Sequence, residues 1–175
     1  MEINFAGQVA LITGGSGDIG RAIGEGLVQA GARVCLVDIH SQRLDQVCHD
    51  LAGRYGPGLA LPVLADVRDS GQVRLAFERA LQEFGRLDIL VNNAAATQIK
   101  PIDALDDEDI DLIVDTNLKG YVKCAREAVR IIKAAGTPGS LLFISSKNGL
   151  HGASDKSLYC ATKGGELTMA RSLAL

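Results

Sequence analysis

The stretch Val9-Ala10-Leu11-Ile12-Thr13-Gly14-Gly15-Ser16-Gly17-Asp18-Ile19-Gly20 decides the fold. Its first five residues form a nearly uninterrupted apolar run, which predicts a short strand buried on both faces. Its glycines permit the positive φ angles of a tight turn. A helical pattern follows over Ile19–Ala30. The stretch therefore predicts a strand, a glycine-rich turn and a helix, in that order.

The same alternation of short strand and longer helix continues along the chain. Further apolar runs predict strands at Arg33–Asp38, Leu59–Ala65, Ile89–Asn92 and Ser140–Ser145. Helical spacing of apolar residues predicts helices at Gln42–Tyr55, Ser70–Phe84 and Asp106–Ala135, and another from about Leu158. This order is typical of an α/β fold with a Rossmann-like, doubly wound parallel sheet in three α/β/α layers. We expect one such domain over residues 1–175.

The last part of the chain departs from this pattern. The helix expected from about Leu158 is still running at Leu175, with no Gly or Pro after it as a stop signal. A doubly wound sheet of this type normally has a sixth strand beyond such a helix. We therefore expect the fold to be truncated after the fifth strand and the helix that follows it.

Composition and charge argue against several classes of protein. The net charge of -3 gives no electrostatic reason to expect binding to nucleic acid or to an anionic membrane. The four cysteines form no CxxC pair and have no histidine at zinc-ligand spacing, which is typical of unpaired thiols in a reducing compartment. No apolar run reaches the ~18 residues of a membrane span. The N-terminus has no basic region followed by an apolar stretch, so we expect a cytoplasmic location.

The glycine-rich turn predicts a phosphate-binding site. The helix after it offers unpaired N–H groups and the positive end of its dipole, and glycines let the backbone approach a pyrophosphate closely. A glycine-rich turn by itself can be purely structural. The position between a buried strand and an amphipathic helix favours nucleotide binding.

Asp38 indicates which dinucleotide would bind. It ends the second expected strand, eighteen residues beyond Gly20. A carboxylate there can accept hydrogen bonds from both ribose hydroxyls of NAD and would repel the extra phosphate of NADP. The alternative is an aspartate that caps the next helix or lies in the loop before it. We expect NAD in preference to NADP.

Tyr159, Lys163 and Ser146 are the candidate catalytic residues. Tyr159 and Lys163 are four residues apart and share one helix face. A nearby ammonium stabilises a phenolate and lowers the pKa of a tyrosine, which is otherwise near ~10. Ser146 lies thirteen residues before Tyr159, just past a strand, where its hydroxyl could hold a substrate oxygen. Taken alone, the tyrosine and lysine could equally be an exposed pair.

Asn117 lies inside the apolar stripe of the helix expected over Asp106–Ala135. A buried amide needs hydrogen-bond partners, so this residue could be a satisfied core asparagine or part of the site. The acidic run Asp106-Asp107-Glu108-Asp109 at the start of the same helix is better explained by the helix dipole than by a metal. We expect no metal site.

Together these residues resemble the ordered motifs of the short-chain dehydrogenases/reductases, in the ordinary branch of that family. The matching residues span nearly the whole chain and are Thr13–Gly20, Asp38, Ala65-Asp66-Val67, Asn92-Asn93-Ala94-Ala95, Asn117, Ser145-Ser146 and Tyr159-Cys160-Ala161-Thr162-Lys163. The resemblance implies an oxidoreductase that transfers a hydride between NAD(H) and a secondary alcohol or ketone. It also implies a homodimer or homotetramer, built on the helix from Asp106 and the helix from Leu158.

The resemblance assigns a role to each candidate. Tyr159 would be the general acid/base, and Ser146 would orient the reacting oxygen. Lys163 would contact the nicotinamide ribose and lower the pKa of Tyr159, and Asn117 would support a water-linked proton relay. The residues expected to bind or flank the cofactor are Gly14, Ser16, Gly17, Asp18, Ile19, Gly20, Asp38, Asp66, Val67, Asn92, Asn93, Ala94, Tyr159 and Lys163. Of these, Asp66 and Val67 would flank the adenine, and Asn92 and Ala94 would line the cofactor channel.

Asp18 departs from the family pattern, and the glycine spacing around it leaves the function open. Asp18 stands where the family usually has a glycine, and we expect its side chain to point away from the phosphates or to cap the helix. The resulting glycine spacing resembles the extended branch, so a nucleotide-sugar epimerase or dehydratase is one alternative. A non-catalytic NAD-binding module is another. The polar segment Lys147–Gly152 favours a polyol or sugar-like substrate.

Overall fold

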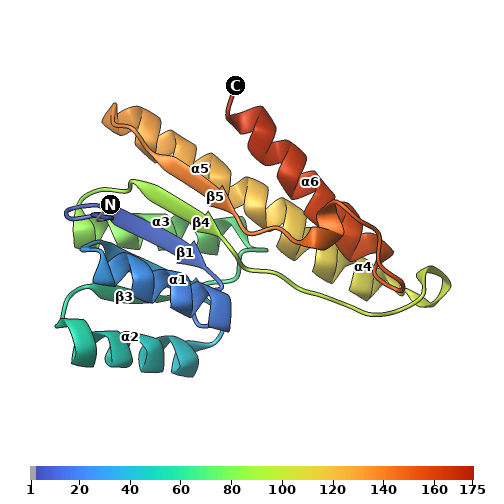
Figure 1. Ribbon diagram of the computed structural model, residues 1–175, viewed down its shortest axis with the longest axis horizontal. Coiled ribbons are helices and arrows are strands. Elements are labelled where there is room, and N and C mark those ends of the chain that lie inside the picture. Colours follow the sequence, from blue (N-terminus) through green and yellow to red (C-terminus); the bar gives the residue numbers. More distant parts are fainter. Residues whose placement is uncertain (1–2) are drawn as a thin grey trace.

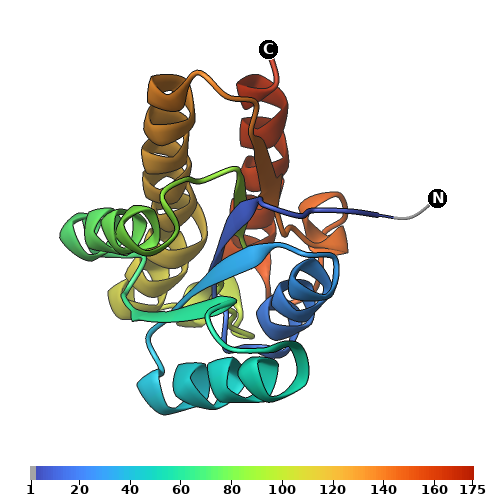
Figure 2. The ribbon, with the colours of Figure 1, turned by 90° about the vertical axis from the view of Figure 1, so that its left-hand side faces the viewer.

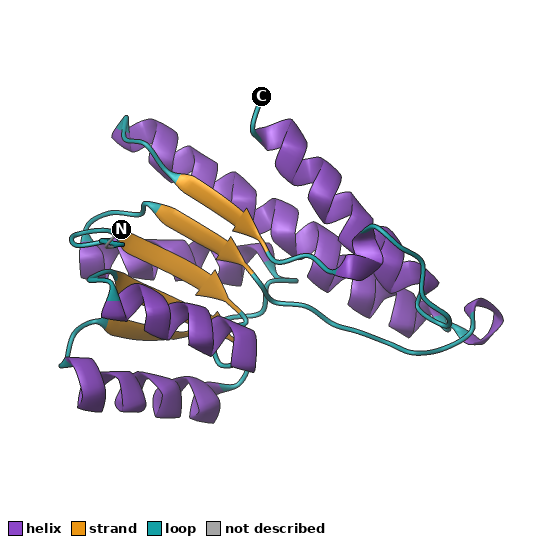
Figure 3. Ribbon diagram, in the orientation of Figure 1, coloured by secondary structure: helices purple, strands orange, loops and turns teal. Residues whose placement is uncertain are grey.

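A computed structural model describes residues 3–175 as a five-stranded parallel sheet flanked by helices (Figures 1 and 3). The strands are β1 (Val9–Thr13), β2 (Arg33–Asp38), β3 (Ala60–Leu64), β4 (Ile89–Asn92) and β5 (Ser140–Phe143). The main helices are α1 (Asp18–Gln29), α2 (Ser41–Tyr55), α3 (Ser70–Phe84), α4 (Asp107–Val114), α5 (Tyr121–Ala135) and α6 (Ser157–Leu173). The predicted Rossmann-like α/β fold is confirmed.

The strand order places a crevice above the middle of the sheet. The order is β3-β2-β1-β4-β5, so the chain reverses direction across the sheet between β1 and β4. Thr13 at the end of β1 pairs with Val37 of β2, and Ile12 pairs with Val91 of β4. The carboxyl ends of these three strands therefore lie together. In open α/β sheets, this switch point is where ligands bind.

Two apolar layers hold the helices against the sheet. On one face, Ala10, Ile12 and Leu36 pack against Val28 of α1 and Leu44 of α2. On the other face, alternate residues of the same strands pack against α3 and α5 (Figure 2). This is the period-two alternation of strand side chains, with both faces covered. The three-layer arrangement follows from it.

The prediction that the strands are buried on both faces is confirmed for the central strands and is wrong for the two outer ones. All residues of β1 and β4 are buried. In β3 and β5, which lie at the edges of the described sheet, exposed residues alternate with half-buried ones. Pro62 fits this position, because proline cannot donate to a neighbouring strand and is confined to edges. Both edge strands are also shorter than expected, since Leu59, Ala65, Ile144 and Ser145 fall outside them.

The single helix expected over Asp106–Ala135 is broken into three parts. Asp106 caps α4 and forms a capping box with Asp109, which supports the dipole explanation of the acidic run. A π-helical turn, Asp115–Gly120, then separates α4 from α5. Single π-turns inside α-helices frequently occur at functional sites. The apolar periodicity continues through the π-turn, so the sequence pattern did not predict that the helix is interrupted there.

Within residues 3–175, none of the helices combines the length and the apolar character needed to cross a membrane.

Candidate active site

The glycine-rich turn is shaped by close backbone contacts. Gly14 has a φ of +64°, which favours glycine, and a Cβ there would lie 2.9 Å from Asn93 Nδ2. A Cβ on Gly20 would lie 2.2 Å from the Gly14 carbonyl oxygen. These two glycines let α1 begin directly against the turn. Gly17 differs from them, because a Cβ there would meet only the Gly14 oxygen, at 3.5 Å.

Thr13 and Asn93 connect this turn to β4. The Thr13 hydroxyl accepts hydrogen bonds from the Asn93 and Ala94 N–H groups at 3.0 and 3.1 Å. The Asn93 side chain donates to the Thr13 and Gly14 carbonyl oxygens at 2.9 and 3.1 Å. Asn93 therefore fixes the shape of the turn and does not point freely into the crevice. Asn92 differs from the expectation, because it is wholly buried and donates to the Tyr121 carbonyl oxygen at 3.2 Å.

A cavity of about 530 Å³ lies at the carboxyl ends of β1, β2 and β4. Its walls are Gly14, Gly17, Asp18, Ile19, Val37, Asp38, Ile39, His40, Ala65, Asp66, Val67, Arg68, Asn93, Ala94, Ala95, Ala96, Leu112 and Thr116. Most of the residues expected to bind a cofactor thus share one cavity, including Gly14, Asp38, Val67 and Ala94. Ser16, Gly20 and Asn92 do not line it.

The cavity fits the phosphates and ribose of a dinucleotide. The first N–H groups of the twelve-residue helix α1 have no partner within the helix and point toward its N-terminus. The buried Ser16 hydroxyl next to them has no hydrogen-bond partner among the described residues. An orphaned hydroxyl beside a helix N-terminus is the donor that a phosphate oxygen would satisfy. The turn is therefore chemically suited to a pyrophosphate.

Asp18 does not cap α1. The N-cap is Gly17, which has no side chain to act as a cap, and Asp18 is the first helical residue. The expectation that Asp18 would cap the helix is therefore wrong, because the N-cap lies one residue earlier. An acidic residue in the first turn is still favourable next to the positive end of the helix dipole.

The Asp38 carboxylate joins the end of β2 to the glycine-rich turn. It accepts hydrogen bonds from the Ser16 N–H at 3.1 Å and from the Ile39 N–H at 2.7 Å. The helix-cap alternative does not hold, because the N-cap of α2 is His40. The carboxylate lines the cavity at the same time, which places a negative charge where the expected ribose would lie.

Asp66 and Arg68, which follow β3, form another wall of the cavity. The Arg68 guanidinium donates to both carboxylate oxygens of Asp66, with distances of 2.9 and 2.7 Å to Oδ2. These hydrogen bonds lower the pKa of Asp66 below its usual value. Asp66 thus presents a firmly ionised carboxylate at this wall. Arg68 was missed at the sequence level, although its place two residues after Asp66 is a visible signal.

Asn117 lies in the π-turn and is fully buried, as predicted. Its side chain accepts from the Ala96 N–H at 2.8 Å and donates to the Ala96 carbonyl oxygen at 2.9 Å. It also donates to the Thr162 hydroxyl at 3.2 Å, and that hydroxyl donates to the Tyr159 carbonyl oxygen at 2.9 Å. Asn117 therefore links the segment after β4 to the helix that carries Tyr159.

Ser146 and Ser145 use their hydroxyls differently. Ser146 precedes the short 3-10 helix η3 (Lys147–Gly149), and its hydroxyl accepts from the Asn148 N–H at 3.2 Å. The Ser145 hydroxyl donates to the Lys163 carbonyl oxygen at 2.8 Å, which ties the end of β5 to α6. The Ser146 hydroxyl keeps its own proton available for another acceptor, as the predicted role requires.

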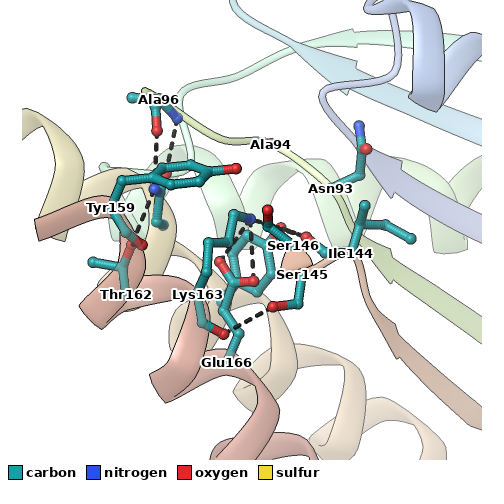
Figure 4. Close-up of polar contacts among 12 residues, drawn as sticks. Asn93, Ala94, Ala96, Ile144, Ser145, Ser146, Tyr159, Thr162, Lys163 and Glu166 are labelled. Carbon is teal, nitrogen blue, oxygen red and sulfur yellow. Dashed lines mark hydrogen bonds and ion pairs between the residues drawn. The ribbon is translucent and has the colours of Figure 1, made fainter. Parts of the chain in front are cut away.

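Tyr159 and Lys163 share one face of α6 (Figure 4). The Lys163 Nζ lies 5.8 Å from the centre of the Tyr159 ring, close enough for attraction between the cation and the ring face. In residues 3–175 the Tyr159 hydroxyl has no hydrogen-bond partner. Figure 4 shows this hydroxyl directed toward the side of the site where Ala94 and Asn93 lie. The phenol therefore lies beside the cation, with its hydroxyl directed toward residues that line the cavity.

Glu166 is a second residue that sequence reasoning missed. Its carboxylate is wholly buried and pairs with the Lys163 ammonium at 2.8 Å. Lys163 also donates to the Ile144 carbonyl oxygen at 2.9 Å, and its Nζ lies 3.4 Å from the Tyr121 hydroxyl. A signal was present, because positions 159, 163 and 166 form one helical stripe.

The structure thus brings Ser146, Tyr159 and Lys163 together beyond the carboxyl end of β5. These three residues lie beside the cavity and do not line it. Asn117 reaches them only through Thr162. Within the described part of the chain, no group of three or more potential metal ligands is present.

Comparison with known proteins agrees with this geometry. The family model described as "short chain dehydrogenase" matches residues 8–175. Sorbitol-6-phosphate 2-dehydrogenase of Escherichia coli is 36% identical over 169 residues, which are 96% of this chain and 65% of that protein. The 3-oxoacyl-(acyl-carrier-protein) reductase FabG of Thermotoga maritima is 34% identical over 173 residues, which are 98% of this chain and 69% of that protein.

A solved structure also superimposes closely. The crystal structure of sorbitol-6-phosphate 2-dehydrogenase SrlD from Erwinia amylovora matches with a TM-score of 0.90 and 33% identity, over 94% of this chain and 64% of that one. The matched part of the chain spans between a quarter and about four fifths of the length of these and other similar curated proteins, and 65% of the sorbitol-6-phosphate 2-dehydrogenase.

Proposed function

This chain belongs to the short-chain dehydrogenase/reductase family of oxidoreductases, and we propose that it transfers a hydride between NAD(H) and a secondary alcohol or ketone, with Tyr159 as general acid/base. The observation that carries this proposal is the position of Tyr159. Its ring lies 5.8 Å from the Lys163 ammonium, and its unpartnered hydroxyl points toward Asn93 and Ala94, which line the cavity at the switch point of the sheet.

Tyr159, Ser146 and Lys163 each have a separate role in the proposed proton transfer. A bound nicotinamide would supply the hydride acceptor or donor. In oxidation, Tyr159 takes the proton of the substrate hydroxyl, and in reduction it returns that proton to the carbonyl oxygen. The Ser146 hydroxyl donates a hydrogen bond to the same oxygen. The Lys163 ammonium, 5.8 Å from the centre of the Tyr159 ring, would place a positive charge beside the phenolate that this step requires.

We propose NAD as the preferred cofactor because of Asp38. Its carboxylate lines the cavity and is held in place by the N–H groups of Ser16 and Ile39. A fixed carboxylate can accept hydrogen bonds from two ribose hydroxyls and repels a 2′-phosphate. The orphaned Ser16 hydroxyl and the first turn of α1 would hold the pyrophosphate, and Asp66 and Val67 would flank the adenine.

A polyol or sugar-like alcohol is the substrate class that we propose. The segment after Ser146 carries the exposed side chains Lys147 and His151, and η3 holds it against α6, since a Cβ on Gly149 would lie 2.7 Å from the Lys163 carbonyl oxygen. A polar segment beside the catalytic serine suits a substrate with several hydroxyl groups. One of the similar proteins is named as a dehydrogenase of a sugar-alcohol phosphate, which supports this class.

We also retain the cytoplasmic location and a homodimer or homotetramer as proposals. The four cysteines are all unpaired, as a reducing compartment would leave them. Sedimentation velocity of the purified protein would test the assembly.

The Tyr159→Phe variant tests the proposed chemistry. It removes the proton donor and keeps the ring, so turnover of a panel of polyols and secondary alcohols, followed by NADH absorbance, should fall to background. NAD(H) affinity, measured by calorimetry, should stay within about twofold, because the phenol does not contact the phosphate-binding turn. Unchanged turnover in Tyr159→Phe would refute the proposal. If wild-type protein binds NAD(H) and turns over none of the panel, the non-catalytic alternative is favoured instead.

A further inference from the structure

Tyr159, Lys163 and Glu166 line up along α6. Positions four and seven residues after Tyr159 return to the same face of an α-helix, so the three side chains form a stripe. The stripe faces the end of β5 and the π-turn, and there it is buried: Lys163 is 2% exposed and Glu166 is 0% exposed. A carboxylate thus occupies a core position where an apolar side chain would ordinarily pack.

The hydrogen bonds of Lys163 are fully used inside the protein. Its ammonium contacts Glu166 Oε1 at 2.8 Å, Glu166 Oε2 at 3.1 Å and the Ile144 carbonyl oxygen at 2.9 Å. The Tyr121 hydroxyl lies 3.4 Å from the same nitrogen, so the three N–H groups of the ammonium all have partners inside the protein. Glu166 is the only anion among these partners. A buried lysine without an anionic partner loses its proton easily, because burial disfavours the charged form.

Two other titratable groups, Tyr121 and Tyr159, lie close to the Lys163 ammonium. Tyr121 approaches from α5, with Cys124 behind it on the same helix, and Tyr159 lies on α6. The end of β5 offers the Ile144 carbonyl and the Ser145 hydroxyl. Burial raises the pKa of Tyr121 well above its usual value and raises the pKa of Cys124 to about 12. Neither side chain can therefore replace Glu166 as a counter-charge near neutral pH.

We propose that Glu166 is a positioning residue that holds the Lys163 ammonium in place and keeps it protonated beside Tyr159. The inference rests on the proposed roles of Tyr159 and Lys163, and it adds a third side chain to them. Glu166 would touch neither substrate nor cofactor. It would act on the phenol through Lys163, because a neutral amine at that position could no longer stabilise a phenolate.

Burial also affects Glu166 itself. Desolvation raises the pKa of its carboxyl from 4.5 to about 7, although the hydrogen bonds from Lys163 oppose the rise. The carboxyl is thus ionised above neutral pH, the range in which a buried lysine most needs a counter-charge.

The charge state of Lys163 can be measured directly, with protein labelled at the lysine Cε carbon. The Lys163 resonance is assigned by its absence in Lys163→Met, and its pH midpoint is compared between the wild type and Glu166→Gln. We expect the midpoint to fall by at least about 1 pH unit in Glu166→Gln. Glu127→Gln is the matched control, because Glu127 pairs with Arg126 and Arg130 on α5. An unchanged Lys163 midpoint in Glu166→Gln would overturn the proposal.

The effect on Tyr159 separates a positioning role from a merely structural one. Tyrosinate absorbance, after subtraction of the Tyr159→Phe spectrum, gives the midpoint of the Tyr159 phenol. We expect Glu166→Gln to raise this midpoint, and to cause no further rise in a Lys163→Met background. A lower or unchanged midpoint, or an equal rise without Lys163, would show that Glu166 does not act through the lysine.

If Glu166→Gln does not fold, the pairing of Lys163 and Glu166 can be tested in the wild-type protein. The Lys163 Cε and Glu166 Cδ resonances should then share a titration step, since the ionisation of one partner changes the field at the other. A Lys163 resonance that ignores the ionisation of Glu166 would refute the pairing. None of these measurements needs turnover, so their failure is distinguishable from failure of the oxidoreductase proposal, which the Tyr159→Phe assay tests.

Discussion

Asn117 and Ala96 exchange two hydrogen bonds, one from the Ala96 N–H at 2.8 Å and one to the Ala96 carbonyl oxygen at 2.9 Å. The side-chain amide of Asn117 thus pairs with a backbone peptide group as a neighbouring strand would. It does so from inside the π-turn, which widens the helix where the chain after β4 passes it. The wall of the cavity and the helix that carries Tyr159 are therefore held by one buried side chain.

Replacement of Asn117 by Ala should destabilise the protein by about 2–4 kcal/mol, because it leaves the N–H and C=O of Ala96 without partners. Urea unfolding would give this change, and the Ala96 amide should exchange its hydrogen faster. Asn148→Ala is a suitable control, since the side chain of Asn148 takes part in none of the hydrogen bonds described above. Equal stability of Asn117→Ala and Asn148→Ala would contradict the assignment.

Replacement of Gly20 by Ala should destabilise the protein by about 1–3 kcal/mol, because the new Cβ would lie 2.2 Å from the Gly14 carbonyl oxygen. NAD(H) affinity should fall as well, since the turn must open to admit the methyl group. Gly26→Ala in the same helix meets no atom within 4 Å and should instead stabilise the protein by about 0.5–1 kcal/mol. The two alanine variants would be compared by thermal unfolding with and without NAD(H). Similar behaviour of both would contradict the packing argument.

Replacement of Asp38 by Ser should lower the preference for NAD over NADP by about tenfold or more, a change of ~1.4 kcal/mol. The serine removes the charge that repels a 2′-phosphate and one acceptor for the ribose. Absolute affinity for NAD should also decrease, because Asp38 holds the Ser16 and Ile39 N–H groups. Dissociation constants of both dinucleotides would be measured by calorimetry. Asp45→Ser, on the exposed side of α2, should leave the ratio unchanged.

The stability of the protein should carry a pH dependence that comes from Glu166. Its pKa is raised from 4.5 to about 7 in the folded state, so the folded form retains a proton that the unfolded form releases between these values. The stabilisation is therefore complete below about pH 4.5 and is lost as the pH rises to about 7. Urea unfolding at several pH values should show the wild type losing stability relative to Glu166→Gln across this window. A constant difference between the two would count against the raised pKa.

The local patterns of the sequence were sufficient for the elements that define the fold. The apolar runs of β1, β2 and β4 were predicted to the residue, and so was α3. Apolar runs and helical spacing are properties of residues that are close in sequence, so they can be recognised without knowledge of the tertiary structure. The glycine spacing and the four-residue step from Tyr159 to Lys163 are local in the same way. They placed the phosphate-binding turn and the shared face of α6 correctly.

The tertiary structure decided which groups meet. Asn117 in the π-turn pairs with a backbone peptide from another part of the chain, and the periodicity of the helix does not indicate such a partner. Asn92 and Asn93 are neighbours in sequence, yet one points into the core and the other holds the glycine-rich turn. Lys163 meets Glu166 and Ile144 only because α6 packs against the end of β5. Hydrogen bonds and ion pairs form between groups that packing brings together. The spacing of residues along the chain therefore indicates the candidate site residues, and the folded structure determines their partners.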